Sequence, residues 1–120
     1  MIRHLILAAV LLPLPALAEN PRTLRIDYFH TGNVDSEVFS LDRAVLEPLA
    51  FPGNLGQPID HTLRGKYAFE VADPATGNVA WSRSFSSIYG EWETTGEARR
   101  MNRTFHESVR LPNQPEPFDL

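Results

Sequence analysis

The segment from Trp81 to Trp92 reads Trp-Ser-Arg-Ser-Phe-Ser-Ser-Ile-Tyr-Gly-Glu-Trp and holds both tryptophans of the 120-residue chain. In its first half, Trp81, Arg83 and Phe85 fall on one side of an alternating pattern, and serines fall on the other. A period of two is typical of a β-strand with one apolar and one polar face. Since buried aromatic side chains dominate the energetics of small cores, the segment predicts a core strand followed by an aromatic anchor.

A functional interpretation of the same residues stays open. Trp81, Tyr89 and Trp92 could instead form an exposed aromatic surface that binds a glycan or a peptide. Arg83 interrupts the apolar side, so its side chain is expected either to reach water or to pair with a carboxylate.

The residues before Trp81 predict a β-hairpin. Tyr67, Phe69 and Val71 alternate with small or charged residues, and the turn sequence Asp-Pro-Ala-Thr-Gly-Asn follows at 73–78. Alternation resumes from residue 79 to residue 86. Two alternating runs joined by turn residues indicate antiparallel strands with a loop longer than the two-residue minimum.

Three further segments alternate and are predicted as strands: residues 24–30, 37–45 and 104–111. A helix over residues 41–46 competes with the second of these, but Pro48 would stop it at once. Residues 48–61 hold three prolines and two glycines, which predicts a long connection that covers an open end of the sheet.

A short helix is predicted from about Thr95 to Arg103. Glu97 would complete a capping box, and Ala98 and Met101 fall at helical spacing. Pro112, Pro115 and Pro117 predict an extended, linker-like tail over residues 112–120. Together the segments predict an all-β fold: an antiparallel β-sandwich of about five strands, jelly-roll-like or partly open, with one short helix.

The first 18 residues have the features of a secretory signal peptide. A positive start with Arg3 is followed by the apolar run 5–12 and by the small-residue site Ala16-Leu17-Ala18. The apolar run is too short to span a bilayer, so no membrane association is expected after cleavage. The prediction is a secreted or periplasmic protein with one domain over residues 19–111.

Composition excludes several function classes. Removal of residues 1–18 takes away Arg3 and no acidic residue, so the net charge changes from −4 to −5. An acidic chain without a basic cluster is a poor candidate for binding nucleic acid or anionic membranes. The chain has no cysteine, which excludes disulfides, thiolate metal sites and cysteine nucleophiles.

No catalytic site, metal site or cofactor is predicted. His106-Glu107 begins like the zinc motif H-E-x-x-H, but Arg110 stands where the second histidine is required. His30 and His61 each have an aspartate nearby, and such a pair could hold a metal. Ordinary polar residues with satisfied hydrogen bonds are the favoured interpretation.

An ordered series of segments nevertheless resembles a known family. The segments are Asp27-Tyr-Phe-His-Thr-Gly-Asn33, Phe39-Ser-Leu-Asp-Arg43, Gly65-Lys-Tyr-Ala-Phe-Glu-Val71, Asp73-Pro-Ala-Thr76, the stretch 82–95 and the stretch 104–112. Together they resemble the N-terminal domain of the IgA-peptidase family of secreted zinc metallopeptidases (peptidase family M sixty-four), and Phe-Ser-Ser-Ile-Tyr-Gly-Glu-Trp at 85–92 is the most specific part.

The resemblance implies a β-sandwich that precedes a catalytic domain. In that family the zinc ligands lie in the catalytic domain, so none of them is carried onto this sequence. The function expected is that of a non-catalytic accessory domain that packs on or orients a catalytic domain. The expected protein partner is either that catalytic domain or another strand that pairs with an exposed sheet edge. The alternative is a stand-alone secreted module that binds a glycan or a peptide through the aromatic surface.

Overall fold

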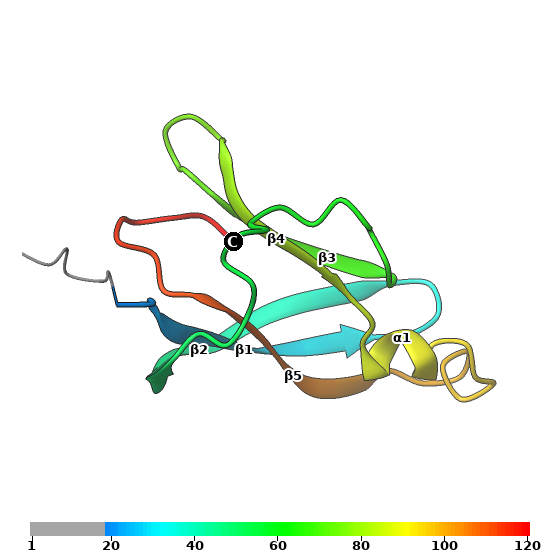
Figure 1. Cartoon of the computed structure of the whole chain (residues 1–120). Helices are drawn as coiled ribbons and strands as arrows, with labels where there is room; N and C mark the ends of the chain where they lie inside the picture. The colour runs from blue at the N-terminus through cyan, green and yellow to red at the C-terminus, as the bar shows by residue number, and fades with distance from the viewer. Residues whose placement is uncertain (1–18) are drawn as a thin grey trace, which may run out of the picture.

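The computed structural model describes residues 19–120 as two antiparallel sheets and one short helix (Figure 1). Sheet A has the order β2-β1-β5, and sheet B is the hairpin β3-β4. The strands are β1 (Arg22–Gly32), β2 (Glu37–Ala50), β3 (Tyr67–Ala72), β4 (Val79–Phe85) and β5 (Arg103–Pro112). The predicted all-β antiparallel fold is confirmed, whereas the predicted signal peptide lies outside the described residues.

Strand β1 is the centre of sheet A because it pairs on both sides. Its register with β5 is unbroken from Thr23 opposite Pro112 to Gly32 opposite Arg103. Its register with β2 shifts after Asp27: Asp27 pairs with Arg43 and the next residue pairs with Leu41, so Asp42 of β2 has no partner on β1. Such an extra residue is a β-bulge, which bends the strand that carries it.

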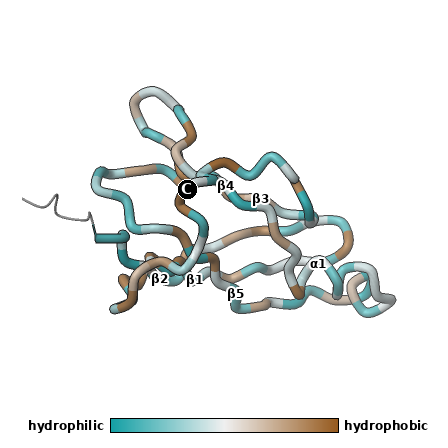
Figure 2. Tube along the Cα trace, in the orientation of Figure 1, coloured by the Kyte–Doolittle hydropathy of each residue, from teal (hydrophilic) through white to brown (hydrophobic). Residues whose placement is uncertain are grey.

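The main core lies between the two sheets. Apolar residues that alternate along β1, β3, β4 and β5 point into this space, and Figure 2 shows hydrophobic stretches in strands of both sheets. The buried members are Ile26, Tyr28, Val71, Trp81, Val109 and Leu111. The period of two in the sequence therefore decides which residues form the core.

A second, smaller cluster closes one end of the sandwich. It is formed by Tyr89, Trp92 and Ala98, with Phe105 packed against it. Helix α1 (Ile88–Trp92) carries the first two of these side chains beside the start of β5 (Figure 1).

The helix lies earlier in the chain than the sequence predicted. The expected helix from Thr95 to Arg103 does not form, since residues 93–100 are turns and bends. Ser87 caps α1 instead, because its hydroxyl accepts a hydrogen bond from the Gly90 amide at 3.0 Å. The apolar spacing after Thr95 was too weak, with Gly96 in the first turn, to outweigh the burial of Tyr89 and Trp92.

Strand β2 also runs further than predicted, through Pro48 to Ala50. Proline is tolerated there because β2 lies at the edge of sheet A, where one side of the backbone needs no ladder partner. The Arg22 side chain supports this irregular part by donating to the carbonyl oxygens of Leu46 and Glu47.

The C-terminal residues fold back onto the sandwich, whereas the sequence predicted a linker-like tail. The Asn113 amide donates to the Arg22 carbonyl at 2.8 Å, and Phe118 packs against the main core. Asp119 then pairs with Ala72 of β3 in an antiparallel bridge. No helix in residues 19–120 has the length and hydrophobicity that crossing a membrane requires.

We expect Leu111→Ala to lower the free energy of unfolding by about 2–5 kcal/mol, because Leu111 is fully buried between the sheets and the substitution leaves a cavity. Urea denaturation measures this change. Leu49→Ala is the matched control: Leu49 is 77% exposed, so a change within about 0.5 kcal/mol is expected. Equal losses in the two variants would contradict the assignment of the core.

Candidate functional site

The three aromatic residues proposed as a binding surface are all buried. Trp81 is 3% exposed, Trp92 is 8% exposed and Tyr89 has no exposed surface. Trp81 belongs to the main core, and the other two belong to the end cluster. They do not form an exposed platform, so the structure agrees with the interpretation of core anchors.

Arg83 is a charged residue on the apolar side of β4, and its side chain lies over the aromatic ring of Trp81. Its guanidinium carbon is 3.8 Å from the ring centre of Trp81, and its Nη1 donates to the carbonyl oxygens of Pro58 and Ser82. A cation over an indole is attracted to the face of the ring. Arg83 therefore fastens the long loop 51–66 to β4.

His30 is a fully buried polar residue in the centre of an aromatic group. Its ring stacks on Tyr89 at 3.8 Å and on Phe39 at 4.1 Å between ring centres. Its Nε2 is 2.7 Å from Glu37 Oε2, and its Nδ1 is 3.1 Å from Glu107 Oε2. Because ionised carboxylates only accept hydrogen bonds, both contacts form together only when both ring nitrogens carry protons.

The same cluster restrains Tyr67 and Glu37. The Tyr67 hydroxyl donates to Glu37 Oε2 at 3.0 Å. Burial and this bond to a carboxylate raise the pKa of Tyr67 to about 12. Partial burial raises the pKa of Glu37, but the hydrogen bonds from His30 and Tyr67 outweigh it, so the net pKa is below the usual value. The cluster joins β1, β2, β3 and β5 through hydrogen bonds and is a structural element.

On the opposite face of β1, Asp27 is the centre of an ion network. Its two carboxylate oxygens accept hydrogen bonds from Arg25, Arg43 and Ser108, at 2.7–3.1 Å. These bonds, with that from Arg25 the strongest, hold the pKa of Asp27 well below its usual range. Glu47 extends the network, because it accepts hydrogen bonds from Arg25 and Arg110.

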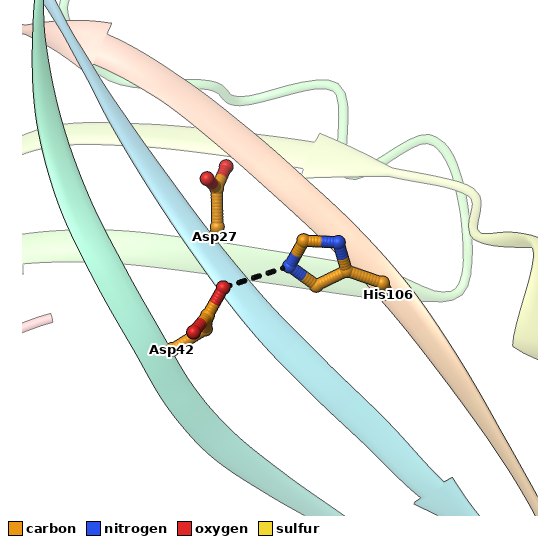
Figure 3. Close-up of side chains that lie close together, drawn as sticks. All are labelled: Asp27, Asp42 and His106. Atoms are coloured by element: carbon orange, nitrogen blue, oxygen red, sulfur yellow. Dashed lines mark hydrogen bonds and ion pairs between the residues drawn. The ribbon is translucent and has the colours of Figure 1, made fainter.

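Asp27, Asp42 and His106 come close enough together to suggest a metal site (Figure 3). Their ligand atoms lie within 4.8 Å of one another, and His106 Nε2 is 3.1 Å from Asp42 Oδ2. The donor set does not fit a cation, however. Both oxygens of Asp27 already accept bonds from guanidinium groups, and Arg25 and Arg43 place positive charge where a metal would bind. The group is therefore part of the ion network.

A hollow of about 640 Å³ lies along the long loop and is lined by residues 53–54, residues 56–62 and Arg83. The Asp60 carboxylate in it accepts hydrogen bonds from Thr62 and Ser84, which lower the pKa of Asp60. His61 is exposed and is not among the partners of Asp60. These bonds attach the loop to β4 and do not assemble reactive groups.

An apolar cleft of about 380 Å³ opens between the two sheets, and we call it the inter-sheet cleft. It is lined mainly by side chains from β1, β2, β3 and β4, among them Tyr28, Phe39, Leu41, Phe69, Phe85 and Leu120. The Tyr28 hydroxyl is buried and has no hydrogen-bond partner among the described residues, and the same holds for Trp81 Nε1. Burial, together with the nearby Glu107 carboxylate, raises the pKa of Tyr28.

The sequence pattern placed the histidines near aspartates, but the structure separates them. Asp27 and His30 differ by an odd number of positions in β1, so their side chains lie on opposite faces of sheet A. The importance of Tyr28 was missed because its position in the alternation marks only a core residue. The available signal was a tyrosine on the apolar face, whose hydroxyl needs a partner once it is buried.

The contribution of the Asp27 ion network to stability is expected to depend on pH. Asp27→Asn should lower the urea midpoint at pH 7, and the difference from the original chain should narrow as the pH falls below about 4. The folded-state pKa of Asp27 is depressed, so its contribution is present above the unfolded-state pKa and is lost as the pH falls through the folded-state value. The control is Asp35→Asn, because Asp35 is exposed. A pH-independent difference for Asp27→Asn would contradict this role.

Two tyrosines should respond oppositely to loss of the hydroxyl. Tyr89→Phe should lower the free energy of unfolding by about 1–2 kcal/mol, because the Tyr89 hydroxyl donates to the Asn33 carbonyl at 2.7 Å and contacts the Ser36 carbonyl at 3.1 Å. Tyr28→Phe should leave stability unchanged or raise it, since it removes an unpaired buried hydroxyl. Chemical denaturation of both variants measures the change in free energy of unfolding. A clear loss of stability in Tyr28→Phe would contradict the conclusion that the Tyr28 hydroxyl has no hydrogen-bond partner.

Comparison with known proteins gives one finding about the family. The model of the family described as Peptidase M64 N-terminus matches residues 18–119. A search of the curated proteins gave no match. The matched range spans both sheets, the end cluster and the residues that fold back onto β3. The family is that of an N-terminal domain of a peptidase and not that of its catalytic domain, and this chain belongs to it.

Proposed function

We propose that this chain is a non-catalytic accessory domain of an M64 peptidase, and that it packs against the catalytic domain and orients it or helps it to fold. The observation that carries the proposal is the family match over residues 18–119. An N-terminal domain of a peptidase has a catalytic domain as its natural partner, so the expected interaction is between folded domains.

The chemistry of the described residues supports a structural role. The buried ionisable side chains Asp27 and His30 are both held by neighbours within the domain. Catalytic groups are usually placed in a cleft with reactive atoms free to meet a substrate. The inter-sheet cleft is lined instead by apolar residues together with Tyr28 and Ser40. We extend the proposal to location: the N-terminal sequence favours a secreted or periplasmic protein.

Exposed apolar residues on β2 support a protein partner. Val38, Leu41 and Leu49 are 61%, 72% and 77% exposed, and Figure 2 shows a hydrophobic stretch at the C-terminal end of this strand. Scattered exposed apolar residues are normal. Val38 and Leu41 pair with Thr31 and Tyr28 and lie on opposite faces of the sheet, so they support contact along the β2 edge and not one flat apolar patch. The burial of Trp81, Tyr89 and Trp92 gives no such support to a glycan-binding surface.

Co-expression with the catalytic domain of an M64 peptidase from the same host tests the proposal. We expect the two to elute together in gel filtration and the catalytic domain to gain soluble yield and thermal stability. A double variant with exposed residues replaced, Leu41→Ser with Leu49→Ser, should weaken the complex while the chain itself stays folded. The proposal fails if the catalytic domain folds alone, binds no copy of this chain and has unchanged peptidase activity in its presence.

A further inference from the structure

The outer edge of β3 already accepts another piece of chain at one end. The Ala72 amide donates to the Asp119 carbonyl, and the Asp119 amide donates to the Ala72 carbonyl, each at 2.9 Å. This reciprocal pair is the closely bonded type of an antiparallel ladder. It sets both the direction and the register of any strand that continues along β3.

Among residues 19–120, the next positions of this edge have backbone groups without a hydrogen-bond partner. In an antiparallel ladder the groups of alternate residues point to the same side, so Ala68 and Glu70 point to the same edge as Ala72. The partner strand agrees: the amides of Ser82 and Ser84, which lie opposite Glu70 and Ala68, bond to the loop and not to β3. Ala68 and Glu70 are both exposed.

The inter-sheet cleft lies along the same edge. Ala68 and Phe69 of β3 line it, and Leu120, next to the bridging Asp119, lines it as well. Tyr28 also lines this cleft, and its hydroxyl is buried without a hydrogen-bond partner in the described residues. An unpaired edge beside an incompletely filled apolar space is suited to an added strand whose side chains enter that space.

Sheet A has two edge strands, β2 and β5, and the described residues add no bridge to either of them like that of Asp119 on β3. The edge of β2 is less suited than that of β3. The bulge opposite Asp27 interrupts its hydrogen-bonding pattern, and Pro48 removes one donor. Strand β3 has no proline, and the irregularity of the hairpin lies where β4 has an extra residue, between Trp81 and Val79. Of these two edges, that of β3 is both regular and already occupied at one position.

We propose that β3 docks an extended strand of the peptidase catalytic domain, antiparallel to β3, which continues the register of Asp119 and Leu120 and fills the inter-sheet cleft. This inference rests on the function proposed above and names the surface that carries it. Side chains on the face of Leu120 enter the cleft, and those on the face of Asp119 point to solvent. The docking strand therefore alternates polar and apolar residues.

A pair of added tails tests the edge and requires no partner sequence. The first is Thr-Val-Thr-Val-Thr-Val joined directly after Leu120, which places valines on the cleft side. The second, Val-Thr-Val-Thr-Val-Thr, has the same composition and places them on the solvent side. We expect the first tail to slow amide exchange at Ala68 and Glu70 by at least about tenfold and to raise the urea midpoint, and the second to do so much less.

A substitution of the edge provides the matched control. Glu70→Pro should abolish the gain from the first tail, because it removes an outward amide, whereas Glu70→Ala should retain it. Both substitutions are also made without a tail, so that any effect on the domain itself is subtracted. Rapid exchange at Ala68 and Glu70 with both tails overturns the proposal, as does equal protection by the two tails or protection of β2 amides instead.

The source of the strand is tested separately, with the co-expressed catalytic domain. Protection of the Ala68 and Glu70 amides in that complex supports the peptidase as the source, provided that protection of the Ala68 amide is lost with Glu70→Pro and kept with Glu70→Ala. A stable complex in which these amides still exchange fast overturns the edge and leaves the accessory function standing. Protection that appears in the untailed chain alone as its concentration rises overturns the proposal, because a second copy then occupies the edge.

Discussion

Sheet B has two strands and sheet A has three, so the inner face of sheet A extends beyond the strands that cover it. Strand β2 is the strand left partly uncovered. Its inward residues Phe39 and Leu41 are 51% and 72% exposed, whereas Ile26 and Tyr28 on the neighbouring β1 are buried. A core covered on only part of its width can be stable, but it leaves apolar surface in water. The inter-sheet cleft and the exposed apolar residues of β2 both follow from this inequality.

Strand β1 keeps the uneven sandwich in one register. Its apolar face carries Tyr28 and His30 into the interior, and its other face carries Asp27 into the ion network. A shift of one residue would exchange the two faces and remove the hydrogen-bond partners of both Asp27 and His30. Leaving a buried charge without its partner costs several kcal/mol, so these residues define the pairing even where they add little net stability.

The sequence predicts the strands well because alternation is a local signal. The hairpin of β3 and β4 and the strands β1 and β5 follow from residues two apart, whatever the rest of the chain does. The position of the helix depends on tertiary burial: Ser87 caps it and Tyr89 and Trp92 anchor it in the end cluster. The path of β2 through Pro48 depends on its place at the edge of a sheet, which no local pattern reveals.

The candidate site was harder to predict because it is a cleft, an incompletely filled space between the two sheets. Residues on all five strands and near the C-terminus surround the inter-sheet cleft, and most of them by themselves have the pattern of ordinary core residues. The aromatic segment that stands out in the sequence is core, while the edge of β3 has the plain sequence Tyr-Ala-Phe-Glu-Val-Ala. Small and exposed residues such as Ala68 let a second backbone approach, and a regular edge without proline or bulge has no local defence against pairing. A domain that must associate with a partner gains from such an edge, because backbone hydrogen bonds fix its orientation and the cleft adds selectivity for apolar side chains.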